Sequence, residues 1–182
     1  MKKLTVLLVL ALVLVFTMGT SAQEFSAENM KFVGGLTYNT YDGTFSGEGS
    51  PTVDNGLGFY LAGQYWFDTE MAVEMGYDRA MSKVANHDAS LSGLYGKFVY
   101  TLNPMMHLKG GLAYYGFKAD SSLVDDGKGI GFLIGGDYKY PMDEGISLVG
   151  SANYRMANMD LDNDVELDMS GFSISGGVCI KY

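Results

Sequence analysis

Apolar and polar residues alternate along most of this chain in strand-length segments that come in pairs. Four segments rise on every second residue to a tyrosine: Phe32-Gly34-Leu36-Tyr38, Val73-Met75-Tyr77, Leu108-Gly110-Leu112-Tyr114 and Leu148-Gly150-Ala152-Tyr154. Each is followed by a returning segment, and these end at Tyr65/Phe67, Phe98/Tyr100, Tyr138/Tyr140 and Ile180/Tyr182. The closing tyrosines are 39, 37 and 40 residues apart, so one hairpin recurs about four times. Because a period of two is that of a strand, the pattern predicts an all-β chain of eight antiparallel strands.

Residues of the opposite parity are small or charged, and we expect them to face the interior of a barrel. The charged ones form a candidate lumen network: Glu74, Asp78, Lys97, Lys109, Asp137, Lys139 and Arg155. An eight-stranded barrel is just wide enough for side chains to fill it, so these opposite charges should pair and close the lumen. Inward Tyr60, Trp66, Tyr95 and Tyr115 add bulk. The alternative is a narrow pore lined by the same charges.

Aromatic residues stand at both margins of the apolar runs, which favours a membrane barrel over a soluble one. A soluble barrel would bury the apolar set and expose the charged set to water. Tyr and Trp prefer the headgroup level of a bilayer, so the margins predict an aromatic girdle. Its members are Tyr38, Tyr77, Tyr114, Tyr154, Tyr65, Phe67, Phe98, Tyr100, Tyr138, Tyr140 and Tyr182. We therefore predict an up-and-down transmembrane β-barrel, whose closure satisfies every backbone group in lipid.

Short and long connections alternate along the chain. The short ones, residues 68–70, 103–105 and 141–145, have the Pro, Asn, Asp and Gly content of turns. The long ones, residues 41–55, 80–90, 118–128 and 157–168, carry much of the acidic excess. In membrane barrels short turns face the periplasm and long loops face outward, so we expect both termini on the periplasmic side.

Glycines recur on the outward face of most strands: Gly34, Gly63, Gly96, Gly110, Gly136, Gly150 and Gly176. Glycine weakens a strand, so its recurrence beside aromatics predicts curvature, with rings covering the exposed backbone. A smooth groove for a partner or a lipid chain is the alternative.

The first 22 residues have the composition of a secretory signal. Met1-Lys2-Lys3 is basic, residues 4–16 are apolar, and Thr20-Ser21-Ala22 is typical of a cleavage site before Gln23. The apolar stretch is shorter than the ~20 residues of a spanning helix, although an uncleaved anchor is the alternative. We expect a cleavable signal peptide (1–22), a short N-terminal tail (23–29) and the barrel (30–182), with no room for a second domain.

Charge and cysteine content narrow the functional classes. Without the signal peptide, ten basic residues face 21 acidic ones, so the net charge of −11 argues against nucleic acid as a partner. The single cysteine, Cys179, cannot form an internal disulfide, and its parity places it inside the barrel. We interpret it as a buried small residue rather than a reactive thiol.

The acidic run at residues 157–168 has carboxylates at alternate positions. Asp160, Asp162 and Asp164 match the opening of an EF-type calcium loop. Val165 stands where that loop needs glycine, and Gly171 where it needs glutamate. We interpret the run as a solvated loop without a metal site, with weak divalent-mediated contact to lipopolysaccharide as the alternative.

His87-Asp88-Ala89-Ser90 offers a base and a nucleophile in the second long loop. Neighbouring loop residues seldom form a catalytic site, because triads are assembled across a fold. A lipid-modifying enzyme using His87 is therefore the least favoured function, and we expect neither an enzyme nor a cofactor.

The eight strands, the alternating loop lengths and the terminal Tyr182 resemble the small outer-membrane barrels of the OmpA transmembrane-domain and OmpX type. Val178, Ile180 and Tyr182 share one face of the last strand, which is similar to the signature that the barrel-assembly machinery is thought to recognise. The resemblance implies a location in the outer membrane of a Gram-negative-type bacterium and a structural, membrane-stabilising or adhesive role, with a narrow channel as the alternative. The partners it implies are outer-membrane lipid, lipopolysaccharide, the assembly machinery and an extracellular ligand at the outer loops.

Overall fold

The computed structural model describes residues 26–41, 44–45, 53–84, 87–120, 126–161 and 166–182, so the expected signal peptide lies outside the described residues. Nearly all of the described chain is β-strand. The eight long strands are β1 (Met30–Asn39), β3 (Gly56–Trp66), β4 (Met71–Val84), β5 (His87–Asn103), β6 (Met106–Ala119), β7 (Gly127–Asp143), β8 (Ile146–Leu161) and β10 (Gly171–Lys181). Two short strands, β2 (Thr44–Phe45) and β9 (Glu166–Asp168), and a 3-10 turn, η1 (Ala27–Asn29), accompany them.

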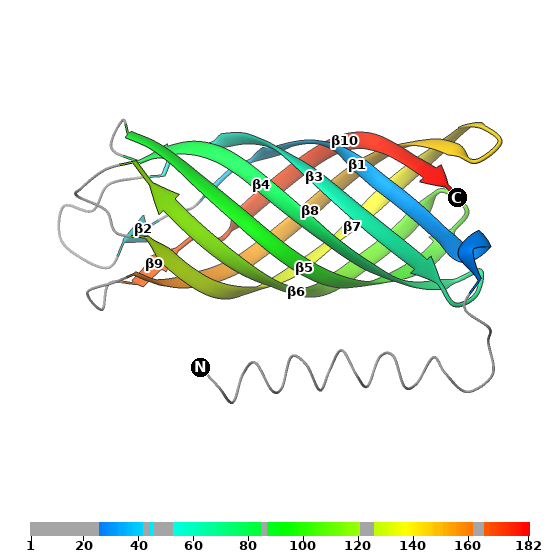
Figure 1. The fold of residues 1–182 in the computed structure, drawn as a ribbon, viewed down its shortest axis with the longest axis horizontal. Coiled ribbons are helices and arrows are strands. Elements are labelled where there is room, and N and C mark those ends of the chain that lie inside the picture. The colour runs from blue at the N-terminus through cyan, green and yellow to red at the C-terminus, as the bar shows by residue number, and fades with distance from the viewer. Residues whose placement is uncertain (1–25, 42–43, 46–52, 85–86, 121–125, 162–165) are drawn as a thin grey trace.

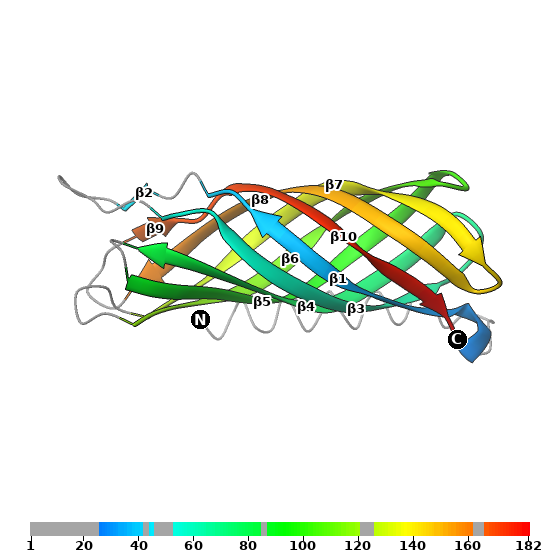
Figure 2. The ribbon, with the colours of Figure 1, turned by 90° about the horizontal axis from the view of Figure 1, so that it is seen from above.

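The long strands form one closed antiparallel barrel. Each pairs with the next along the chain, β8 pairs with β10, and β10 pairs with β1 from Lys31 opposite Lys181 to Asn39 opposite Ser173. Figure 1 shows the tilted strands from one side, and Figure 2 shows β1 beside β10 at the seam. The predicted eight-stranded antiparallel barrel is confirmed. Within the described part of the chain, no helix has the length and apolarity needed to cross a membrane.

The two ends of the barrel differ in their connections. At the end that holds η1 and the C-terminus, here called the turn end, the strands join through residues 67–70, 104–105 and 144–145 (Figure 1). Asp68 Oδ1 accepts hydrogen bonds from the backbone N–H groups of Glu70 and Met71, each 2.7 Å long. Gly145 adopts a φ of 83°, which favours glycine. The third turn is shorter than predicted, because β7 continues through Pro141 to Asp143.

The loop end, opposite the turn end, corrects the predicted loops. The β4–β5 ladder runs from Met71 to Val84, which pairs with His87, so most of the expected loop 80–90 is strand. Strand β6 reaches Ala119 and β8 reaches Leu161, and β9 pairs with β8 inside the expected loop 157–168. The sequence pattern missed these extensions because the strands reverse their polarity there.

The reversal is visible along single strands. In β8, outward Tyr154 and Met156 give way to outward Asn158 and Asp160. In β6, the inward positions change from charged Lys109 to the fully buried Tyr115 and Phe117. Apolar-out alternation suits a wall in lipid, and polar-out alternation suits a wall in water. The strands therefore cross a lipid boundary near the loop-side tyrosines and continue beyond it.

The extended part of the barrel has an apolar interior. Its buried side chains, here called the loop-end core, are Tyr41, Val53, Val84, Leu91, Phe117, Met159, Leu161, Leu167 and Met169. They come from strands β4, β5, β6, β8 and β9 and from the segments that follow β1, precede β3 and follow β9. This half of the barrel is organised as a water-soluble β-barrel would be, with its core inside.

Aromatic rings were expected to cover the outward glycines, but most of the ring contacts are on the inward face. Among the outward glycines, a Cβ on Gly63 would meet the Phe32 ring at 4.0 Å, and a Cβ on Gly96, Gly150 or Gly176 would meet nothing within 4 Å. On the inward face, a Cβ on Gly76 would lie 2.5 Å from Tyr95 Cζ, and one on Gly93 would lie 2.5 Å from Tyr115 Cε1. Each tyrosine is the cross-strand partner of its glycine. The inward glycines thus provide room for the tyrosines that fill the lumen.

Replacing Gly93 with alanine should destabilise the barrel by about 1–3 kcal/mol, because the added methyl overlaps the Tyr115 ring. The matched control is Gly96→Ala on the same strand, whose methyl points outward into open space. Urea unfolding of the protein refolded into lipid vesicles measures both. Equal unfolding midpoints for the two variants would contradict the proposed packing.

Candidate functional site

The centre of the lumen holds a chain of alternating charges. Glu74 on β4 pairs with Lys97 on β5 at 3.6 Å and forms a close contact with Lys109 on β6. Lys109 Nζ also lies 2.5 Å from Asp137 Oδ2 on β7. The strand register brings these groups together, because Lys97 stands directly opposite Glu74 and the other two follow on the next strands. We call Lys97, Glu74, Lys109 and Asp137 the central network.

A residue that the sequence reading did not single out extends this network. Gln64 on β3 is fully buried, donates to Glu74 Oε2 at 2.6 Å and accepts from Lys139 Nζ at 3.2 Å. Gln64 has the same inward parity as Ala62 and Trp66, which was the available signal. The predicted lumen network comprises only charged residues. Gln64 thereby links Lys139 to the central network.

Arg155 and Asp78 form a separate group toward the loop end. Their charged atoms are 3.8 Å apart, and Arg155 Nε donates to the backbone oxygen of Met169 at 3.3 Å. The guanidinium also lies 5.2 Å from the ring centroids of Tyr41 and Tyr115. Burial raises the pKa of the Tyr41 phenol, which lies beyond the end of β1. Arg155 thus connects the polar lumen to the loop-end core.

A small polar cavity separates the two charged groups. Its volume is about 40 Å³, and Tyr60, Tyr95, Asn39, Asn153 and Ser175 are among its lining residues. Buried water needs roughly 10–15 Å³ of such volume per molecule, so the cavity holds a few waters at most. The lumen is therefore a packed polar interior at this level.

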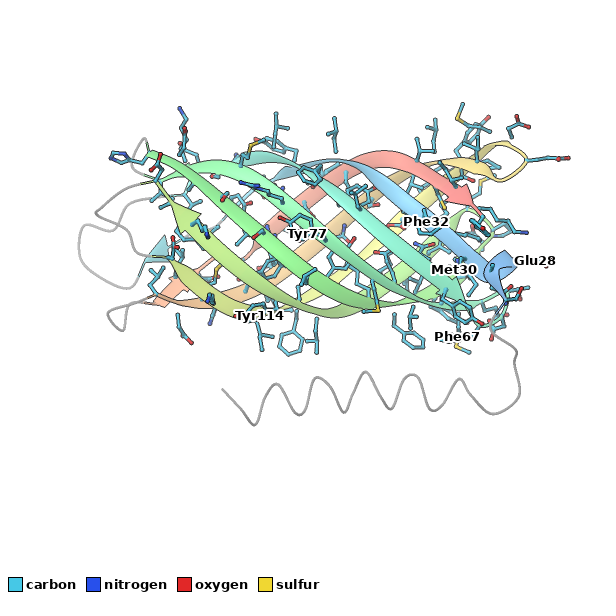
Figure 3. All side chains as sticks on the ribbon, in the orientation of Figure 1. Glu28, Met30, Phe32, Phe67, Tyr77 and Tyr114 are labelled. Carbon is cyan, nitrogen blue, oxygen red and sulfur yellow. The ribbon has the colours of Figure 1, made fainter. Side chains whose placement is uncertain are left out.

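The predicted girdle residues lie on the outside of the barrel near two levels. Figure 3 shows Phe67 at the turn end, with Tyr77 and Tyr114 displaced toward the loop end and β4 and β6 continuing past them. Ring pairs occur at both levels, such as Tyr65 with Phe67 at 5.5 Å and Tyr154 with Phe172 at 4.8 Å. Val178, Ile180 and Tyr182 are exposed on the outer face at the seam strand β10.

The remaining candidate residues do not assemble into a reaction centre. His87 and Ser90 lie on one strand at odd spacing, which directs their side chains to opposite faces of the sheet. Asp160 is on β8, whereas Asp162 and Asp164 lie outside the described residues. In the described ranges no group of three or more His, Cys, Asp or Glu side chains is arranged to hold a metal ion. Cys179 is buried beside Val33 and Val149.

The sequence model of one family, described as the outer membrane protein beta-barrel domain, matches residues 8–178. No curated protein matches the sequence.

Solved structures with a similar fold are small outer-membrane barrels. OprG from Pseudomonas aeruginosa has 17% identity and a TM-score of 0.62, covering 84% of this chain and 95% of that one. Neisserial surface protein A has 16% identity and a TM-score of 0.59, covering 88% and 100%. Ail, the attachment invasion locus protein of Yersinia pestis, has 16% identity and a TM-score of 0.57, covering 84% and 99%. At these identities the likeness concerns the fold.

Replacing Glu74 with alanine should destabilise the barrel by about 3–5 kcal/mol, since it leaves the Lys97 and Lys109 ammonium groups buried with a single carboxylate. Glu70→Ala removes the same charge from an exposed turn and is the matched control. Folded and unfolded barrels migrate differently on a gel, so heating samples before the gel gives the unfolding temperature of each variant. A Glu74 variant as stable as the Glu70 variant would contradict the energetic role of the network.

Proposed function

Since this chain belongs to the outer membrane protein β-barrel family, we propose that it serves the outer membrane as a closed, non-conducting barrel with a structural and membrane-stabilising role. The observation that carries this proposal is the occupancy of the lumen along its length. The central network fills the middle, and the loop-end core fills the part beyond the lipid boundary. An ion moving through would have to displace both.

The energetic argument concerns the loop-end core in particular. Phe117, Met159 and Leu167 are fully buried inside the barrel, and they offer no polar group to a hydrated ion. Removing an ion's hydration in an apolar interior is costly, so an apolar plug blocks conduction more firmly than a charged lumen does. The narrow-channel alternative requires both this plug and the Glu74 contacts to open.

Single-channel recording of the refolded protein in a planar bilayer tests the proposal. We expect a folded protein, verified by its heat-modifiable mobility on gels, that gives no discrete current steps. Reproducible steps whose size changes in Glu74→Ala would establish the channel instead. A further variant, Phe117→Ala with Met159→Ala, checks whether a silent barrel begins to conduct once the plug is thinned.

Contact with an anionic surface is a second candidate function, supported by the outward face of the loop end. Arg79, Lys83, Lys118 and Lys128 are exposed there on strands β4, β6 and β7. They stand beyond the outward Tyr77, Tyr114 and Ile130 of the same strands. The Ail protein, which shares the fold, has been crystallised with the heparin analogue sucrose octasulfate. Lys83 and Lys128 stand opposite Asp88 and Asp160, whereas Arg79 and Lys118 stand opposite serines. We infer that the loop end of this barrel presents cations, chiefly Arg79 and Lys118, to a sulfated or phosphorylated partner such as lipopolysaccharide.

Retention on immobilised heparin tests this second candidate. We expect the wild-type protein to be retained at low salt and released as screening increases, with weaker retention for Lys118→Gln and for Lys128→Gln. Glu70→Gln removes an exposed charge of the opposite sign at the turn end and should elute no earlier than the wild type. Identical elution of all variants, or no retention at low salt, would exclude this function.

The remaining assignments complete the proposal. Residues 1–22 direct export, the turn end faces the periplasm, and the exposed Val178, Ile180 and Tyr182 at the seam are the signal for the assembly machinery. We assign no catalytic role, because His87 and Ser90 face opposite sides of β5.

A further inference from the structure

A cluster of aromatic and cationic groups closes the turn end of the lumen. Lys31 Nζ on β1 lies 4.2 Å from the ring centroid of Trp66 on β3, and Lys139 Nζ on β7 lies 5.2 Å from it. His107 on β6 meets the same ring edge-on, with centroids 5.6 Å apart. Two pairs of neighbouring strands, β1 with β3 and β6 with β7, thus bring side chains together around the Trp66 ring. We call Lys31, Trp66, His107 and Lys139 the vestibule.

The vestibule gathers positive charge without matching negative charge. The Lys31 and Lys139 ammonium groups lie 4.2 and 5.2 Å from the same ring centroid, so they are at most about 9.4 Å apart. Lys181, which is exposed, stands directly opposite Lys31 across the β1–β10 seam. No carboxylate of a described residue lies within 4 Å of any of these three ammonium groups. Like charges held this close repel one another, and an anion between them would relieve the repulsion.

The nearby acidic residues are already engaged or face solvent. Asp137 and Glu74 share Lys109, and Glu74 also contacts Lys97 and Gln64. Glu28 on η1 and Asp143 and Glu144 at the β7–β8 turn are exposed. Asp137 stands directly opposite the vestibule residue His107, but its ion pair is with Lys109, so the described carboxylates leave Lys31, Lys139 and Lys181 without an ion pair.

Vestibule residues and a cross-strand neighbour of one of them carry buried polar atoms without hydrogen-bond partners. Trp66 Nε1, His107 Nδ1 and Thr101 Oγ1 are buried, and none has a hydrogen-bond partner among the described residues. Thr101 stands directly opposite His107 in the β5–β6 ladder. Trp66 is 7% exposed and His107 6%. An indole N–H can only donate, so a buried one without an acceptor is unfavourable unless a ligand or water supplies the acceptor.

From these observations we propose that the vestibule binds a phosphate-type oxyanion. Lys31 and Lys139 supply charge and N–H donors, Trp66 Nε1 supplies a further donor, and exposed Lys181 attracts the anion at the rim. An ammonium has three donors, and Lys139 uses one of them on Gln64, so donors remain for the ligand. Charge-assisted hydrogen bonds of this kind are short and strong.

Stacking of the lysines on Trp66 accounts for only part of this arrangement. A cation–π contact stabilises one ammonium against one ring face, but it leaves the Trp66 N–H without an acceptor and adds no negative charge. The oxyanion satisfies both needs at once. Because the loop-end core closes the other end, the ligand enters and leaves at the turn end, and its binding is a property separate from conduction.

Trp66 is the single tryptophan of the chain, so it reports on its own site. The full-length mature protein, refolded in a neutral detergent, is titrated with inorganic phosphate while sodium chloride is withdrawn to keep ionic strength constant. We expect a saturable change in Trp66 fluorescence. Lys31→Gln and Lys139→Gln should each weaken binding about fivefold to tenfold. Lys83→Gln removes the same charge at the loop end, far from Trp66, and should leave the phosphate-dependent change in Trp66 fluorescence as it is in the wild type.

Two further arms identify the source of the phosphate and guard against misfolded variants. The titration is repeated with micelles containing phosphatidylglycerol in place of free phosphate; a response to free phosphate assigns a soluble ligand, and a response to the lipid alone assigns a headgroup. Lys181→Gln changes an exposed rim residue without disturbing the packed lumen and should weaken binding in either arm. Calorimetry confirms the affinity independently of fluorescence. Absence of saturable binding in both arms, or equal binding by all four variants, would overturn the proposal.

Discussion

Closure of the β1–β10 seam is the constraint on which the rest of this structure depends. Without it, two strands would present unpaired N–H and C=O groups to lipid, where no water can satisfy them. The seam pairs nine consecutive residues of β1 with β10, and it fixes the parity of every other strand through the continuous ladder. One parity therefore always faces inward, and all of the lumen chemistry is contributed by that set.

The polarity reversal shows that parity and polarity are separate properties of a strand. Parity is continuous along β6 and β8, whereas the side chains on each face change character near Tyr114 and Tyr154. The same backbone forms a membrane wall on the turn-end side of that level and a barrel wall suited to water on the loop-end side. The central network and the loop-end core are the two interiors that these two environments demand.

The sequence predicted the part of the fold that lies in lipid, because there the outward residues are apolar and the inward residues are polar. Within the lipid band, Phe32, Leu112 and Tyr138 identify the outward face, and Glu74, Lys109 and Asp137 identify the inward face at the correct parity. On the loop-end side of that band, outward Arg79 and Lys118 are typical of loops, so the pattern predicts strands that are shorter than the observed ones. Parity alone places Glu74 and Lys109 on the same inward face, whereas their contact and the part played by Gln64 depend on the strand register, which the pattern does not determine. Likewise, Lys31 on β1 and Lys139 on β7 both contact Trp66 only because the barrel is closed, since these strands are not neighbours.

The loop-end core also constrains the order in which the molecule is built. Its outer surface carries Asn158, Asp160 and Lys118, so this half does not remain in the hydrocarbon once its interior is formed. In a barrel inserted from the side of its turns, these polar residues must travel through the bilayer before Phe117, Met159 and Leu167 can pack against one another. Formation of this core is then a late step that follows translocation. The core then stabilises the inserted state kinetically, because the packed apolar interior must separate before the barrel can leave the membrane.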